Sequence, residues 1–232
     1  MALRFHCSAL VLGACVALAF ARDAVAGTIV GKVEARSPER AGGTAAGADG
    51  SYGNRRYKFL ERIDYDALRD FVVSIDRVAQ PASATAPPRA VVAQRDGQFL
   101  PHVLPVVVGT DVEWANFDDI FHNVFSISDA CGFDLGLYKR GEAAKTVRFD
   151  VPGRVDVFCS IHTKMSCVVL VLPNPWFARS DDRGRYIIKD VPAGTYRLKA
   201  WHERLPAQIK EVVVPEVGEV RIDFTLGLGQ KP

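Results

Sequence analysis

The sequence has no marked excess of charge of either sign. It carries 29 Lys and Arg against 27 Asp and Glu, which gives a formal net charge of +2. This balance gives no argument for a nucleic-acid or anionic-membrane partner, and we expect neither. No apolar run beyond residues 1–26 reaches the length of a transmembrane helix, so we expect no membrane span. Long internal repeats are also absent.

The first residues have the pattern of a secretory signal. Arg4 gives a short basic start, an apolar run covers 7–20, and small residues stand at the third and first positions before Gly27. We therefore expect residues 1–26 to be a signal peptide and the mature protein to be periplasmic. The stretch VLGAC leaves an alternative, a lipoprotein that begins at Cys15, although the apolar run continues past that residue.

Cysteine is scarce after the signal. Cys131, Cys159 and Cys167 are an odd number, so in an oxidising compartment at least one thiol must be free or bound to something. A disulfide between Cys131 and Cys167 is not expected. A seven-residue strand separates Cys131 from the end of the fold that holds Cys167, roughly 23 Å at 3.3 Å per residue, whereas a disulfide tolerates about 7 Å between Cα atoms.

Short β-strands dominate the remaining chain, and the fold class we expect is all-β. A strand at 27–35, broken by a glycine, is followed by a Gly-, Ala- and Arg-rich loop, a short helix at 59–70 and a strand at 71–78. A Pro/Ala linker at 79–90 excludes a regular element there. From residue 90 onward, β-branched segments alternate with turn signals at close intervals, which indicates a β-sandwich.

The heptapeptide CSIHTKM places a thiol, an imidazole and a thioether within residues 159–165. Strand alternation puts Cys159 on the same inward face as Val155 and Val157. The turn that follows can aim Cys159, His162 and Met165 at one point. Thiolate, imidazole and a weak thioether favour copper, although a buried cysteine is more often simply a small apolar residue.

A copper site of this kind needs a second imidazole. His122, which opens the segment HNVFSIS, is the best candidate, and Asn123 beside it is expected to support the ligand loop by hydrogen bonds. His102 is expected near the same end of the fold, as a structural histidine or as a further supporting residue. His202 is expected to be an ordinary turn residue.

Two other chemistries use part of the same motif. A zinc site could take Cys159, His162 and Cys167, and a nucleophilic pair could take Cys159 with His162. The first would place a ligand inside the next strand. The second has no orienting acid in view, and neither gives Met165 a role.

The segments VVVGTDVEWANFDDIFHNVFSI, GRVDVFCSIHTKM and VVLVLP resemble the copper-binding half of the small cupredoxins, of the amicyanin and plastocyanin type. The Cys-x-x-His-x-x-Met spacing is that of amicyanin. The resemblance covers residues 88–172 and implies a Greek-key sandwich that binds one copper ion, Cu(I)/Cu(II), through His122, Cys159, His162 and Met165. Ile161 and Thr163 stand where such loops usually carry proline, and Lys164 adds a charge there.

The longer layout resembles periplasmic chains of the methylamine-utilization type, in which a cupredoxin precedes a further β module. Residues 173–232, with a turn at 181–184 and another at 192–194, resemble part of a transthyretin-like, carboxypeptidase regulatory-like sandwich. That stretch is too short to bury much core alone, and the strands of 27–87 lack partners. We expect 27–78 and 174–226 to fold together around an inserted copper domain; simple tandem domains are the alternative.

The function that follows is an exported type 1 copper protein that carries single electrons between redox partner proteins. A closed donor set has no open position for a substrate, so we do not expect an enzyme. The alternative is a copper-binding and delivery module, or a docking module, without a role in electron transfer.

Overall fold

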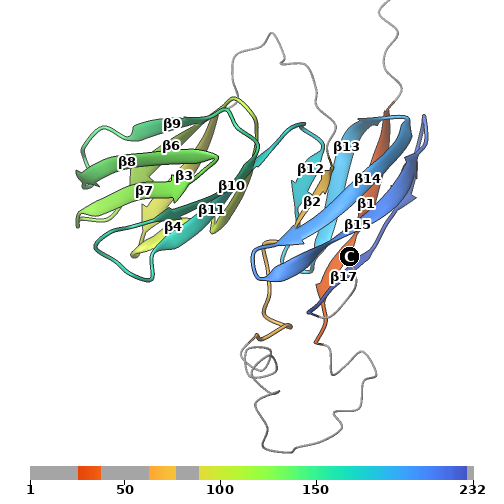
Figure 1. The fold of residues 1–232 in the computed structure, drawn as a ribbon, viewed down its shortest axis with the longest axis horizontal. Helices are drawn as coiled ribbons and strands as arrows, with labels where there is room; N and C mark the ends of the chain where they lie inside the picture. The colour runs from red at the N-terminus through yellow and green to blue at the C-terminus, as the bar shows by residue number, and fades with distance from the viewer. Residues whose placement is uncertain (1–25, 38–62, 77–88, 229–232) are drawn as a thin grey trace, which may run out of the picture.

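A computed structural model describes residues 26–37, 63–76 and 89–228, and in these ranges the protein is all-β. Two sandwiches lie side by side in Figure 1. No helix of the described ranges is long and apolar enough to cross a membrane. The expected signal peptide, with its lipoprotein alternative, lies outside the described residues, as do most of the loop after residue 37 and most of the linker.

The first sandwich contains nine strands in two sheets, one with the order β5-β11-β10-β7-β8 and one with the order β4-β3-β6-β9. The strands are β3(Arg89–Arg95), β4(Gln98–Leu100), β5(Val103–Val107), β6(Thr110–Asn116), β7(His122–Ser128), β8(Cys131–Tyr138), β9(Lys145–Phe149), β10(Gly153–Phe158) and β11(Ser166–Leu172). The chain changes sheet at five connections: β4 to β5, β5 to β6, β6 to β7, β8 to β9, and β9 to β10. These crossings place β7 beside β10, although they are not consecutive.

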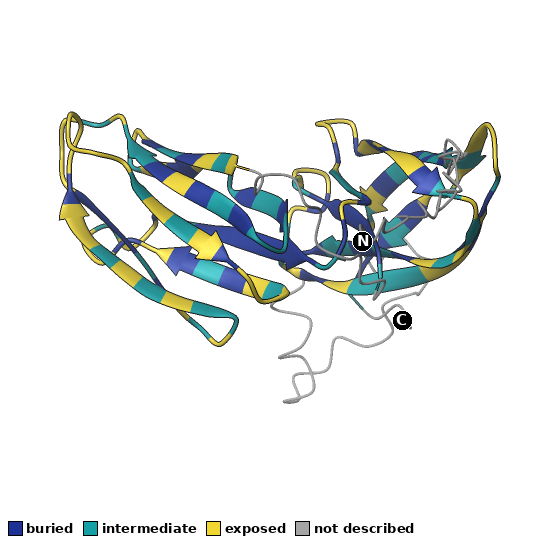
Figure 2. Cartoon of the chain, turned by 90° about the horizontal axis from the view of Figure 1, so that it is seen from above, coloured by how far each residue is buried: buried dark blue, intermediate teal, exposed yellow. Residues whose placement is uncertain are grey.

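Alternating side chains build the core of this sandwich, as Figure 2 shows by the alternation of buried and exposed positions. Val155 and Val157 are fully buried and Cys159 is 5% exposed, which confirms the predicted inward face. The aromatic residues Trp114 and Phe149 fill the centre between the sheets.

The second sandwich joins the two ends of the chain. Its strands are β1(Ala26–Ala35), β2(Val72–Ile75), β12(Phe177–Arg179), β13(Arg185–Pro192), β14(Gly194–His202), β15(Leu205–Val214), β16(Glu219–Arg221) and β17(Phe224–Leu226). β1 lies between β13 on one side and β16 and β17 on the other, and β2 lies between β12 and β14. The pairing expected between the chain ends is present, with the first sandwich inserted between them.

The glycine inside β1 has a steric reason. β1 pairs with β16 up to Val30 and with β17 from Val33, and the chain between those two strands crosses over Gly31. A Cβ atom at Gly31 would stand 1.8 Å from the carbonyl oxygen of Ile222. Only glycine allows this close backbone approach.

The two sandwiches meet through an apolar interface. Val168, Leu170 and Leu172 of β11 form a cluster with Val72 of the second sandwich, and Trp201 packs against it. The alternate residues of β11 face the core of the first sandwich. β11 is therefore buried on both faces, which explains its uninterrupted apolar sequence.

The prediction of a helix at 59–70 is wrong for residues 63–70, the described part of that range. Residues 65–67 form a turn, in which the Asp64 carboxylate accepts the N–H groups of Asp66 and Ala67. Asp70 then adopts a φ of 62°, which a right-handed helix excludes. Local hydrogen bonding by the aspartate side chain outweighs helix propensity here.

Candidate metal centre

Three predicted ligands meet at one end of the first sandwich. His122 begins β7, Cys159 follows β10, and His162 lies in the loop between β10 and β11. Because Phe125 of β7 pairs with Phe158 of β10, the start of one strand lies near the end of the other. The donor atoms of His122, Cys159 and His162 all lie within 4.8 Å of one another.

The donor atoms face each other directly. The Nδ1 atoms of His122 and His162 are 3.1 Å apart, and the Sγ atom of Cys159 lies 3.6 Å from His162 Nδ1. His122 is fully buried and Cys159 nearly so, whereas His162 is partly exposed. Two imidazole nitrogens and one sulfur thus lie together, and of the three residues only His162 is partly exposed.

The ligand loop is closed by its own backbone. The Cys159 N–H donates to the Met165 carbonyl at 3.1 Å, and the Met165 N–H donates to the His162 carbonyl at 2.9 Å. Met165 is 1% exposed and belongs to the same core cluster as Cys159. The structure therefore places the fourth predicted ligand, Met165, at the buried end of a tightly bonded loop.

Asn123 ties the two ligand segments together. Its backbone N–H donates to Cys159 Sγ at 3.4 Å, and its side-chain oxygen accepts the Ser160 N–H at 3.3 Å. Its amide nitrogen donates to Asp134 at 2.7 Å, a contact that, after the N–H of Gly136, helps to hold the pKa of Asp134 below its usual value. An N–H that points at the sulfur stabilises a thiolate.

Asp118 is a site residue that the sequence reasoning missed. Its carboxylate lies 2.8 Å from Nε2 of His122 and also accepts the N–H groups of Asp96 and Gly97. Burial acts to raise the pKa of Asp118, but these hydrogen bonds outweigh it and the pKa is lowered. The available signal was a carboxylate four positions before His122.

An ionised Asp118 determines how His122 is used. A carboxylate only accepts hydrogen bonds, so Nε2 of His122 carries the proton and Nδ1 presents its lone pair toward His162 and Cys159. Paired with a carboxylate in this way, an imidazole is fixed in orientation and becomes a stronger metal ligand. Asp118 thus orients His122, which is not the histidine of the nucleophilic pair Cys159 and His162 considered from the sequence.

The other candidate residues lie outside this cluster. Cys167 pairs with Val157 inside the sheet, so the zinc arrangement with Cys159 and His162 is wrong. Burial raises the pKa of the Cys167 thiol, which keeps it protonated. Cys131, Cys159 and Cys167 are all free, in agreement with the expected absence of a Cys131–Cys167 bridge.

Two further histidines of the described residues lie outside the cluster. His102 contacts the carbonyl of Ser166, the residue after Met165, and the carboxylate of Glu203 in the second sandwich, so it supports the end of the ligand loop without belonging to the cluster. The prediction that His202 is an ordinary turn residue is wrong. It is the last residue of β14, 4% exposed, and packs against Phe71 with ring centroids 5.0 Å apart.

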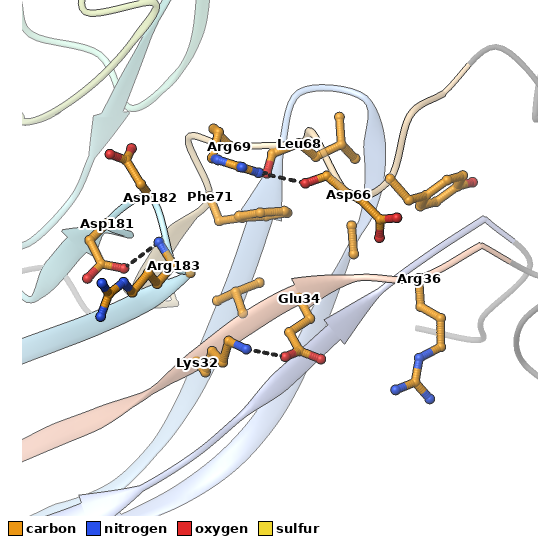
Figure 3. A pocket seen from close by; sticks show the side chains of 14 residues that line it. Lys32, Glu34, Arg36, Asp66, Leu68, Arg69, Phe71, Asp181, Asp182 and Arg183 are labelled. Carbon is orange, nitrogen blue, oxygen red and sulfur yellow. Dashed lines mark hydrogen bonds and ion pairs between the residues drawn. The ribbon is translucent and has the colours of Figure 1, made fainter.

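A polar cavity in the second sandwich is a weaker candidate for a functional site. It measures about 740 Å³ and lies between β1, the segment 65–71 and the turn before β13 (Figure 3). Two of its basic side chains have local partners: Lys32 pairs with Glu34, and Arg69 donates to the Asp66 carbonyl. Among the described residues, the cluster of metal-binding side chains is the one at the end of the first sandwich.

No family model matches the chain, and no curated protein matches it. Solved structures similar to parts of it include a Cu-containing nitrite reductase from Thermus scotoductus SA-01, at 30% identity and a TM-score of 0.35, over 41% of this chain and 25% of that one. This chain thus spans a quarter of the length of that reductase. A purple cupredoxin from Nitrosopumilus maritimus matches at 25% identity and a TM-score of 0.33, over 36% of this chain and 99% of that one.

A methionine-to-alanine variant of amicyanin in its Cu(I) form is also similar, at 25% identity and a TM-score of 0.34, over 43% of this chain and 98% of that one. Each of these similarities covers less than half of the chain. The assignment of the site therefore rests on its own geometry.

Proposed function

We propose that this protein is a type 1 copper protein that carries single electrons. The observation that supports it is the convergence of two imidazole nitrogens and a cysteine sulfur within 4.8 Å, with His122 and Cys159 buried. A donor set of two histidines and one cysteine with a weak thioether suits copper better than the harder cations, which prefer oxygen. His122, Cys159, His162 and Met165 would hold one copper ion.

Bound in this set, copper would supply one-electron oxidation and reduction. The chain's own contribution is a frame that holds the donors in place. Asp118 fixes the imidazole of His122, the Asn123 N–H points at Cys159, and the loop from 159 to 165 is closed by backbone bonds. A frame that does not rearrange between oxidation states suits electron transfer, and the burial of Cys159 argues against a substrate reaching it.

The partly exposed His162 is the proposed route for electrons. Exposed apolar side chains flank the histidine pair, from Phe117, Ile120 and Phe121 before His122 and from Ile161 before His162. Exposed apolar residues gathered near a functional group mark an interaction surface. We propose that a redox partner protein docks there, receives or donates one electron, and leaves.

A copper-delivery function would use the same ligands, but the closed loop favours retention over release. The wider identity is part of the proposal: an exported, periplasmic protein of the methylamine-utilization type, with a cupredoxin inserted into a carboxypeptidase regulatory-like sandwich. The pairing of β1 with β13 and of β2 with β14 supports the second sandwich as one folding unit.

The test is the colour of the purified protein after addition of Cu(II). The wild type should bind one copper and absorb strongly in the visible, because a thiolate transfers charge to Cu(II). Cys159→Ser should remove this absorption, while Cys131→Ser, which changes a thiol outside the cluster, should keep it. A coloured Cys159→Ser protein would show that the thiolate assignment is wrong.

Carrier and delivery functions separate in a second measurement. The copper-loaded protein is cycled between oxidised and reduced states in the presence of a Cu(I) chelator. A carrier keeps its copper through repeated cycles. Transfer of the metal to the chelator on the first reduction would favour delivery.

A further inference from the structure

His102 connects the ligand loop to the second sandwich. Its Nδ1 atom lies 3.1 Å from the carbonyl oxygen of Ser166, and its Nε2 atom lies 3.0 Å from the carboxylate of Glu203. Ser166 directly follows Met165 and begins β11, whereas Glu203 lies in the turn between β14 and β15. A single side chain thus joins residues 37 positions apart, on two different sandwiches.

The chemistry of the two partners determines the state of the ring. A carbonyl and a carboxylate both accept hydrogen bonds, so His102 makes both contacts only when both ring nitrogens carry a proton. The positive charge of that state is balanced by Glu203. A neutral ring has one N–H and must give up one of the two contacts.

Two carboxylates favour the bridged state. The hydrogen bond with Glu203 is the main cause of the raised pKa of His102, burial opposes it, and Asp70 adds to it. The bond with His102 lowers the pKa of Glu203 against the opposing effect of burial, and His202 and Arg154 act in the same direction as His102.

The turn that carries Glu203 is itself attached to the first sandwich. Arg154 of β10 donates to the Glu203 carbonyl at 3.3 Å, and its guanidinium lies 5.9 Å from the centre of the Trp201 ring. Trp201 also packs against the apolar cluster between the sandwiches. Glu203 is therefore held at a fixed distance from β10 and β11, as a positioning group must be.

We propose that Glu203 is a positioning residue for the ligand loop, acting through His102 on the backbone that follows Met165. The His102 ring holds the Ser166 carbonyl, and the His102 carbonyl accepts the Val168 N–H. Met165 directly precedes Ser166, and its carbonyl accepts the Cys159 N–H. By holding Ser166, the His102 ring also holds the start of β11, and the hydrogen bond from Cys159 to Met165 depends on the position of that strand end. Its importance for copper rests on the proposed function.

The test compares Glu203→Gln with Glu216→Gln, which neutralises an exposed glutamate of the same sandwich. In the metal-free protein, amide hydrogen exchange at Cys159 should become about tenfold faster in Glu203→Gln, the size expected for loss of a charge-assisted hydrogen bond. The amide of Val112, in the other sheet of the first sandwich, reports general destabilisation and should keep its wild-type rate. Glu216→Gln should change neither rate.

His102→Gln should produce the same acceleration, and adding Glu203→Gln to it should have no further effect, because both changes break one connection. Additive effects, or equal acceleration at Val112, would overturn the inference. In the copper-loaded protein, Glu203→Gln should also shift the reduction potential relative to Glu216→Gln. A protein that binds no copper but shows the exchange effect would refute the proposed function alone. Normal copper binding with an unchanged Cys159 rate would refute the positioning role alone.

Discussion

Nε2 of His122 lies 2.8 Å from the Asp118 carboxylate, while Nδ1 of the same ring lies 3.1 Å from Nδ1 of His162. One nitrogen of the ring thus contacts an acid, and the other faces the ligand cluster. The protein fixes the tautomer of its buried histidine before any metal arrives.

Replacement of Asp118 by asparagine should weaken copper binding by roughly 10- to 100-fold, the usual effect of losing a carboxylate that supports a histidine ligand. Affinity is measured by competition with a chelator of known strength. Asp119→Asn is the matched control, because Asp119 is an exposed neighbour that pairs with Arg140 instead. Equal losses in the two variants would show that general charge, and not the contact with His122, supports binding.

The two classes of ligand should differ in their effect. Met165→Leu should keep the copper and shift the reduction potential, because a weak axial ligand tunes a site more than it holds the metal. His122→Ala should lower copper affinity far more. Chelator competition and voltammetry on both variants check this order, and similar affinity losses would contradict it.

The three thiols of residues 27–232 should differ in accessibility. Cys131 is partly exposed, whereas Cys159 and Cys167 are buried, so a thiol reagent should modify Cys131 first in the folded, metal-free protein. Burial, followed by the charge of Asp150, raises the pKa of Cys131, so the reaction should be slow near neutral pH. Under denaturing, reductant-free conditions the count should be three. A count of one would reveal a disulfide.

The link between the sandwiches should depend on pH. The pKa of His102 is raised from 6.5, so its contribution to stability is complete below 6.5 and disappears as pH rises through the folded value. The pKa of Glu203 is lowered from 4.5, so its contribution is complete above 4.5 and disappears as pH falls through its folded value. The difference in unfolding free energy between wild type and Glu203→Gln should therefore be greatest between pH 4.5 and 6.5. A difference that does not vary with pH would contradict the ion pair.

Close approach of two backbones makes Gly31 irreplaceable. Gly31→Ala should destabilise the second sandwich, because its Cβ would stand 1.8 Å from the Ile222 carbonyl oxygen. Gly132→Ala is the control, since its Cβ would meet ordinary contacts at 3.8 Å. Denaturant unfolding should show a loss for the first variant of about 1–3 kcal/mol, the range for steric overpacking, and little change for the second.

Periodic features of the sequence predicted the parts of this molecule that depend on local pattern. The alternation of Val155, Val157 and Cys159 predicted the inward face of β10. The N-terminal segment has no partner strand nearby in the sequence, which predicted that β1 pairs with distant strands. Asp118 could not be identified in this way, because its role depends on how the loop before β7 folds back toward residues 96 and 97.

The bridge from His102 to Glu203 was equally hidden from the sequence. It depends on the docking of two sandwiches through β11, and no local period encodes which outer faces meet. The sequence does hold a trace of that docking in the unbroken apolar run of β11, since a strand with one solvent face would alternate. An unbroken apolar run indicates that both faces of the strand are covered, but it does not indicate which residues cover the second face.

The insertion of one sandwich into another orders the events of synthesis. Every strand of the first sandwich lies within residues 89–172, so this sandwich can form its own strand pairs before the last strands of the second sandwich are available. β1 is made first, yet its partners β13, β16 and β17 are made last, and its edges stay unpaired throughout the interval. Among the described strands, β1 therefore waits longest for its partners, and Glu203 becomes available to His102 only after β14 has been made.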